Sequence, residues 1–191
     1  MVQSQQLILE IQDNYQKQSY RNRTYINTAN GRLGLTIPVK HSKSTAHKKT
    51  SNALIENNFL WQRQHWRSIQ IAYRSSPFFE FYEDELAVLY TKEYRELQQF
   101  NLFAIELLLE MLGVDKTFDL TKTYENPTKY NDLRALASAK RKDSQVVIPE
   151  YDQVFGETNE FNAQVSVIDL LFNEGPNAAN HLMKVSLEGI P

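Results

Sequence analysis

Cysteine is absent from this sequence of 191 residues. Its absence excludes disulfide bonds, thiolate catalysis and cysteine-bound zinc or iron–sulfur centres. The six glycines do not cluster into a phosphate-binding loop, and the four histidines do not have the spacing of a metal-ligand pair. The sequence therefore indicates neither a metal site nor a cofactor.

Long hydrophobic runs are missing as well. The longest, such as Leu170–Phe172, fall far short of the roughly 20 apolar residues that span a membrane. The N-terminus also lacks the basic region and apolar stretch of a secretory signal. We therefore expect a cytoplasmic protein without a membrane span. The composition, 41% hydrophobic and 23% charged, is typical of one folded domain over residues 1–191.

Acidic residues are missing from one long segment. Between Asn14 and Ile55 there is no Asp or Glu, whereas the rest of the chain holds all 23 acidic residues. The basic residues of the segment are Lys17, Arg21, Arg23, Arg32, Lys40, Lys43, Lys48 and Lys49. This asymmetry predicts either an anion-binding face or a contact within the chain or between subunits. The net charge of −2 and the lack of a recognition module argue against nucleic acid as a ligand.

Apolar residues alternate with polar ones near the N-terminus, which predicts strands. Leu7–Ile11 is the first of these segments, and Ser19–Asn27 and Arg32–Val39 are the next two. Asn30-Gly31 lies between the last two and is a strong hairpin signal, because both residues tolerate positive φ. The sequence therefore predicts an antiparallel N-terminal sheet.

The middle of the chain has the 3.6-residue periodicity of helices. The predicted helices are Trp61–Arg74, Phe78–Tyr94 and Arg95–Leu112, the last of them closed by Gly113. Between and after these segments we expect a basic loop and three short elements. They are the loop Lys40–Asn52, strands at Ala53–Glu56 and Phe118–Thr121, and a short helix or turn at Tyr130–Ser138.

A capping-box spacing marks the start of a helix near the C-terminus. Ser166 and Asp169 are three residues apart and precede Leu170–Phe172. Gly175-Pro176 then breaks this helix, and a last helix follows over Asn177–Lys184. The predicted fold class is therefore α+β, with the N-terminal sheet packed against a mainly helical middle and C-terminal part.

The densest polar cluster on a predicted element is Asn14–Arg23. On a strand, Arg21, Arg23 and Tyr25 project from one face, about 7 Å apart per pair. Two guanidinium groups at that spacing can hold a phosphate, a sugar nucleotide or a carboxylate. The alternative is that these arginines form salt bridges to the acidic helices.

An aromatic patch surrounds a histidine on the first predicted helix. Its members are Trp61, His65, Trp66 and Tyr73. A histidine is the natural general base near neutral pH. A single histidine on an apolar helix stripe is, however, more often a core residue, and both roles stay open for His65.

Six stretches of the chain carry a family resemblance, in order and over nearly its whole length. They are 13–23, 35–39, His65-Trp66 with Tyr73, 76–79, Asp132-Leu133-Arg134 and 168–176. Together they resemble the WbqC-like family. Members of that family typically begin with a segment similar to Pro-Tyr-Phe-x-Pro-x-x-x-Tyr-Phe ahead of the first strand. This sequence starts almost at that strand, so we expect the segment to be missing or truncated, and any site that it helps to build to be incomplete.

The resemblance implies a bacterial protein connected with O-antigen gene clusters. The first hypothesis is therefore an enzyme of cell-surface polysaccharide biosynthesis, a transferase that moves a group onto an amino sugar or sugar nucleotide. His65 acts as the base, the arginines hold the diphosphate and the aromatic residues stack on the sugar or nucleobase. The residues assigned to ligand binding are Tyr15, Lys17, Arg21, Asn22, Arg23, Trp66 and Tyr73.

The second hypothesis is a non-catalytic binding or scaffold protein. In this case the basic N-terminal face contacts an acidic partner or another subunit of a homo-oligomer, and the same arginines contribute to stability or association. The sequence does not distinguish an enzyme from a binding protein.

Overall fold

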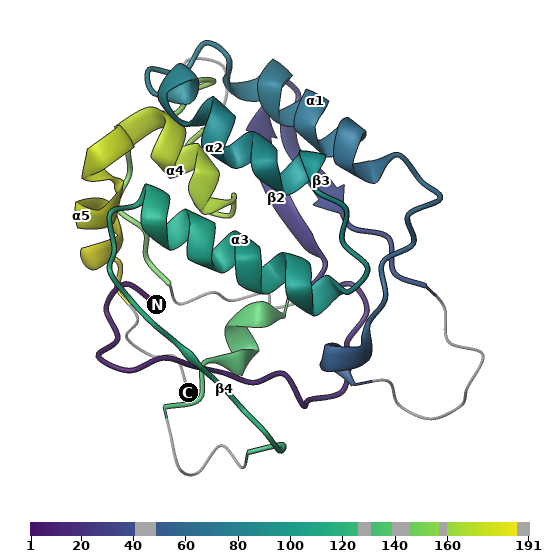
Figure 1. The fold of residues 1–191 in the computed structure, drawn as a ribbon. Helices are drawn as coiled ribbons and strands as arrows, with labels where there is room; N and C mark the ends of the chain where they lie inside the picture. Colours follow the sequence, from purple (N-terminus) through teal and green to yellow (C-terminus); the bar gives the residue numbers. More distant parts are fainter. Residues whose placement is uncertain (41–48, 126–130, 139–145, 157–159, 187–191) are drawn as a thin grey trace.

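A β-hairpin lies behind two of the helices in the computed structural model of the chain (Figure 1). The structure describes residues 1–40, 49–125, 131–138, 146–156 and 160–186. Helix α1 (Trp61–Tyr73) covers the hairpin, and α2 (Phe79–Thr91) packs between α1 and α3 (Leu97–Met111). Helix α4 (Val167–Glu174) packs against α2, and α5 (Ala178–Met183) packs against α4.

The hairpin consists of β2 (Arg23–Thr28) and β3 (Gly31–Thr36), paired antiparallel. Its turn uses Gly31, whose φ of 88° suits a residue without a Cβ. Ile26 and Leu35 lie on one face of the hairpin and are buried in the core. The α+β class and the N-terminal antiparallel hairpin are therefore confirmed.

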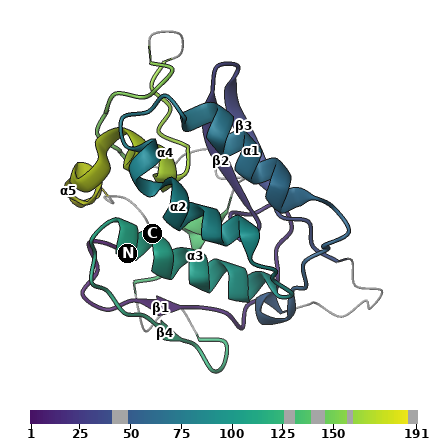
Figure 2. The same ribbon diagram turned by 45° about the horizontal axis from the view of Figure 1, so that its top comes forward.

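The first predicted strand does not belong to this sheet. Only Ile8–Leu9 (β1) is a strand, and it pairs in parallel with Asp119–Leu120 (β4). Figure 2 shows this pair beneath α3. The prediction that Leu7–Ile11 contributes to the antiparallel sheet was wrong, because alternation identifies a strand but not its partner. The segment Phe118–Thr121 was predicted as a strand and supplies that partner.

The predicted helices are confirmed to within a few residues at each end. Helix α2 stops at Thr91 because the backbone of Lys92 is extended, and Tyr94 is therefore a fully buried loop residue. The predicted strand Ala53–Glu56 forms only isolated bridges. Within the described ranges the 3₁₀ helices are η1 (Thr50–Asn52), η3 (Arg134–Ala137) and η4 (Gly175–Asn177). Most of the predicted basic loop, with His41 and His47, and the basic residues 140–142 lie outside the described residues.

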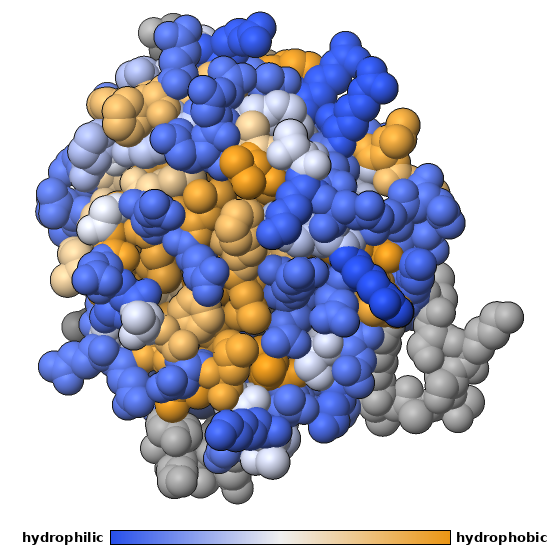
Figure 3. All heavy atoms as spheres, viewed as in Figure 1, coloured by the Kyte–Doolittle hydropathy of each residue, from blue (hydrophilic) through white to orange (hydrophobic). Residues whose placement is uncertain are grey.

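Apolar side chains form a band across the face of the molecule on which α2 and α3 lie (Figure 3). Helix α3 is apolar around most of its circumference, but only Leu97, Phe100 and Leu109 are buried. Its other apolar residues are half-buried, and five of them pack against the core: Phe103, Ala104, Leu107, Leu108 and Met111. Among the residues that the structure describes, no helix has the length and apolarity needed to cross a lipid bilayer.

Gly175 ends α4 in a conformation that other residues rarely adopt. Its φ is 53°, and a Cβ at this position would lie 2.5 Å from Cδ1 of Phe78. The backbone nitrogen of Phe78 donates to the carbonyl of Phe172 at 3.0 Å, which holds the aromatic ring close to the end of α4. Only glycine fits here, because both the backbone conformation and the space exclude a side chain.

Replacing Gly175 with alanine is therefore expected to destabilise the protein strongly. The positive φ costs about 1–2 kcal/mol and the overlap with Phe78 about 1–3 kcal/mol more. Gly113→Ala is a matched control, because Gly113 also has a positive φ, 66°, but nothing lies within 4 Å of its Cβ position. Urea unfolding of both variants checks this, and equal losses in the two would contradict the steric account.

Candidate functional site

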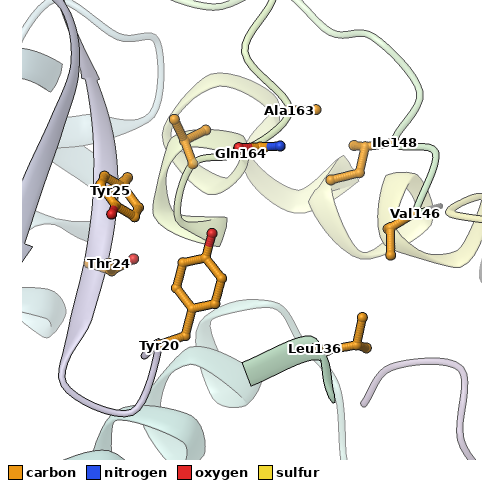
Figure 4. Close-up of a pocket in the computed structure, with 9 residues that line it drawn as sticks. Tyr20, Thr24, Tyr25, Leu136, Val146, Ile148, Ala163 and Gln164 are labelled. Atoms are coloured by element: carbon orange, nitrogen blue, oxygen red, sulfur yellow. The ribbon is translucent and has the colours of Figure 1, made fainter. Parts of the chain in front are cut away.

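A pocket of about 240 Å³ lies between the hairpin, η3 and the C-terminal part of the chain (Figure 4). Its lining residues are Tyr20, Thr24, Tyr25, Leu136, Val146, Ile148, Ala163, Gln164 and Val165. Figure 4 shows Tyr20 extending toward the segment 163–165. The lining combines aromatic and aliphatic surface with hydroxyl groups and one amide, which is the usual chemistry of a small-molecule site.

A guanidinium group stands at the rim of this pocket. Cζ of Arg32 lies 4.2 Å from the centroid of the Tyr25 ring, and its Nη1 donates to Oε1 of Gln164 at 2.8 Å. The Tyr25 ring lies against Gly34 on β3, where a Cβ would be 3.3 Å from Cε1 of the ring. The rings of Tyr20 and Tyr25 meet edge to face at 6.1 Å. The pocket therefore presents a fixed cation beside two aromatic rings, an arrangement that can hold an anionic group.

A buried carboxylate, that of Asp169 on α4, lies behind the pocket wall and is fully shielded from solvent. Its oxygens accept hydrogen bonds from the hydroxyl of Tyr73 at 2.7 Å, the hydroxyl of Tyr151 at 2.8 Å and Nε2 of Gln153 at 2.9 Å. Burial raises the pKa of the Asp169 carboxyl, and these hydrogen bonds act against the rise.

Asp169 therefore does not have the capping-box role that its spacing from Ser166 predicts. Oγ of Ser166 accepts from the backbone nitrogen of Ile168 at 3.5 Å, so this serine does cap α4. The side chain of Asp169, in contrast, turns into the core, where it finds three donors. Hydrogen bonds from residues distant in the sequence thus replace the local hydrogen bond that a capping box would form with the backbone nitrogen of Ser166.

The same network holds the pocket wall against the hairpin. The backbone nitrogen of Asn27 on β2 donates to the Tyr73 hydroxyl at 3.1 Å. The side chain of Gln153 bonds both the nitrogen and the carbonyl of Asn162, at 2.9 and 3.1 Å. The nitrogen of Ser166 donates to the Tyr25 carbonyl at 2.7 Å. Segment 162–166, which supplies three lining residues, is therefore fixed at both ends.

Arg21 forms an ion pair with Asp13. Oδ1 of Asp13 also accepts from Oγ1 of Thr50 at 2.5 Å. Arg21 lies in a turn, and β2 begins only at Arg23. The prediction that both arginines project from one face of a strand was wrong, because turns stabilised by Ser19 interrupt the alternation. The structure thus pairs Arg21 with an acidic residue eight positions earlier in the chain.

Arg23 and Asn22 each carry a buried polar atom that no described residue satisfies. These atoms are Nε of Arg23 and Oδ1 of Asn22, whereas Nδ2 of Asn22 donates to the Ile37 carbonyl at 3.0 Å. Tyr15 is half-buried beside them; burial raises the pKa of its hydroxyl, and nearby arginine charge acts against the rise. Lys17 is exposed. Buried polar atoms without a partner are uncommon, so Arg23 keeps its place as a candidate ligand contact.

The aromatic–histidine patch lies in the core and does not line the pocket. His65 is 8% exposed and meets the rings of Trp61 and Tyr90 edge to face at 5.3 and 6.3 Å. Trp66 is half-buried and stacks on Tyr90 at 5.6 Å. Tyr73 is fully buried and bound to the Asp169 network. The structure therefore does not bring these three residues together with the pocket-lining residues.

His65 is neutral at physiological pH in this environment. Burial lowers its pKa to about 4, and a hydrogen bond to the backbone of Thr36 acts against the fall. A group with so low a pKa is a weak general base at neutral pH. The geometry fits the core role for this histidine.

The sequence did not indicate a pocket, because the lining residues come from segments far apart in the chain. The place of Arg32 beside Tyr25 was open to prediction, since the Asn-Gly turn fixes the register that pairs Asn27 with Arg32 and Tyr25 with Gly34. That register places Arg32 diagonally across from Tyr25 on the same face. No sequence signal pointed to Gln164. Within the described ranges, no three His, Asp or Glu side chains gather as metal ligands.

His65 should make stability depend on pH in a predictable direction. Its folded pKa lies below its ordinary value of 6.5, so the unfolded chain binds more protons between pH 4 and 6.5. Stability should therefore fall by about 2–3 kcal/mol between pH 7 and pH 4.5 because of this residue. The His65→Gln variant keeps a hydrogen-bond donor for Thr36 but does not titrate. Urea unfolding at the two pH values should therefore show a loss of stability in this variant that is smaller by the same amount. The same pH slope in both proteins would contradict the low pKa.

Comparisons with known proteins agree with the sequence resemblance. A model described as "WbqC-like protein family" matches residues 1–148. The chain is 27% identical over 194 residues to "Uncharacterized protein Rv1507c" of Mycobacterium tuberculosis (strain ATCC 25618 / H37Rv), covering 88% of this chain and 83% of that protein. No solved structure matches the chain. Because the family model covers well over half of its length, the chain belongs to the WbqC-like protein family.

Proposed function

We propose that this protein binds an anionic small molecule, of the sugar-phosphate or sugar-nucleotide class, in the pocket between β2 and the segment 163–165. The observation that carries the proposal is the position of Arg32, which stacks on Tyr25 and bonds Gln164 at the pocket rim. A guanidinium held in this way loses little conformational freedom when it binds a phosphate.

The size of the pocket limits what it holds. Sites for whole drug-sized ligands measure about 300–1,000 Å³, whereas this pocket measures about 240 Å³. It therefore suits one ring, with the remainder of the ligand outside beside Arg32. The Tyr20 and Tyr25 rings can stack on a sugar or a base.

An enzymatic role in cell-surface polysaccharide biosynthesis extends this proposal. The association of the family with O-antigen gene clusters supports group transfer onto an amino sugar. The same hypothesis includes a cytoplasmic location for the protein. Among the described residues, none that lines the pocket is a histidine or carries a carboxylate. A general base for the transfer would therefore come from outside the lining, and binding is the part that the geometry supports best.

A scaffold role is the second candidate function. It is favoured by the ion pair of Arg21 with Asp13, because this arginine already has an acidic partner in the chain. A basic N-terminal face of this kind could contact an acidic partner without binding a small molecule. The ligand experiment separates the two functions.

Calorimetric titration at low salt should identify the ligand class. The panel comprises nucleotide-activated amino sugars, sugar phosphates, free nucleotides and neutral sugars. We expect binding by a phosphorylated sugar class, and Arg32→Ala and Tyr20→Ala should each weaken it at least about 10-fold, or about 1.4 kcal/mol. Arg95→Ala is the matched control, since Arg95 is exposed and lies outside the pocket lining.

Two results would overturn the proposed function. One is a folded wild-type protein that binds no member of the panel. The other is an Arg32→Ala variant that binds as tightly as the wild type, because the anion would then be held elsewhere. Neutral sugars binding as well as phosphorylated ones would contradict the role assigned to Arg32.

A further inference from the structure

The outward face of α1 carries a row of arginines. Arg63, Arg67 and Arg74 are exposed and lie on one side of the helix, since at about 100° per residue their directions differ by no more than about 40°. Within the described part of the chain none of them forms an ion pair. A shallow hollow of about 380 Å³ lies over part of this row and is lined by Arg67, Gln70, Ile71 and Arg74. Ile71 is 74% exposed.

The outward face of the neighbouring helix α2 carries the opposite charge. Glu80, Asp84 and Glu85 are exposed, and no described residue forms an ion pair with them. Two apolar side chains stand beside them, Phe81 at 67% and Val88 at 42% exposure. Exposed aromatic and aliphatic residues next to unpaired charges are typical of a protein interface.

The two faces form one surface with a definite order. Nε2 of Gln70 on α1 donates to Oε1 of Glu83 on α2 at 2.9 Å, which marks the seam between the helices. On α1 the arginines lie next to this seam and Ile71 lies beyond them. On α2 the carboxylates of Glu80 and Asp84 lie next to the seam and Phe81 lies beyond them. Across the surface the order is therefore apolar, basic, acidic, apolar.

We propose that this α1–α2 surface binds a second copy of the chain, with α1 of each copy packed on α2 of the other. The two-fold axis of this dimer runs along the seam, so the arginines of one copy face the carboxylates of the other. The same axis brings Ile71 of one copy to Phe81 of the other. The surface is thus self-complementary, as a two-fold symmetric dimer requires.

The mixed charge of the surface favours a second copy over a uniformly charged partner. A nucleic acid or an anionic lipid surface is attracted by the arginines but repelled by the carboxylates beside them. An acidic protein meets the same repulsion at α2. A second copy supplies both signs in the order that the surface needs.

The size of the surface sets the strength of the association. Each helix has 13 residues and is therefore about 20 Å long and about 10 Å wide, so the pair offers a footprint of about 400 Å². This is about half the roughly 800 Å² per partner of a standard interface. Since charge pairs contribute much of the contact, we expect a weak dimer that dissociates in high salt.

Analytical ultracentrifugation of the full chain tests this. The protein is compared at about 0.05 M and about 0.5 M NaCl, over roughly 1–200 µM. One variant reverses the basic charges, Arg63→Glu with Arg67→Glu, and a second reverses the acidic charges, Glu80→Lys with Asp84→Lys. Lys184→Glu and Glu110→Lys are controls, because both residues are exposed and lie on other helices or their ends. Circular dichroism verifies that every variant is folded.

The wild type and both controls should dimerise at low salt and dissociate at high salt. Each charge-reversed variant should remain a monomer, because like charges then face each other across the axis. An equimolar mixture of the two variants should dimerise again, since reversed arginines then meet reversed carboxylates. A monomeric wild type, dimerisation of either reversed variant alone, or a mixture that stays monomeric would each overturn the proposal.

Discussion

The carboxylate of Asp169 joins parts of the chain that are far apart in the sequence. It is fully buried, and a buried carboxylate is costly unless its oxygens receive hydrogen bonds. Tyr73 on α1, Tyr151 and Gln153 supply them, so α1 and the segment around residue 152 must stay close to α4. Tyr73 in turn accepts from the backbone of β2. The position of the hairpin relative to the C-terminal helices thus depends on one charged group.

The pocket is a consequence of that position. One face of the hairpin packs Ile26 and Leu35 into the core, and the other presents Tyr25 with Arg32 stacked on it. The segment 162–166 lies against this second face because the Asp169 network and the Ser166–Tyr25 hydrogen bond hold it there. The proposed dimer surface lies on α1 and α2, whose described residues do not line the pocket.

The sequence predicted what short-range physics determines. The Asn-Gly turn, the helix periodicities and the break at Gly175 all lie where the patterns placed them. It did not predict that β1 pairs with β4, because alternation carries no information about partners. Arg21 and Asp169 were misplaced for a related reason, since each forms side-chain bonds that local spacing does not reveal. The ligand site stays a proposal, because its lining comes from segments whose contacts only the fold defines.

Amide hydrogen exchange in the wild type and in Asp169→Asn tests the role of the buried carboxylate most directly. The amides of Asn27, Asn162 and Ser166 join the hairpin and the pocket wall to the network. With asparagine at position 169, at least one of the three donors loses its acceptor, and the network should weaken by about 1–3 kcal/mol. The exchange rates of these three amides should then rise at least about 10-fold over the wild type. The rise at the Ile69 amide, in the middle of α1, should be smaller. Unchanged protection at the three amides, or the same acceleration at Ile69, would contradict the account.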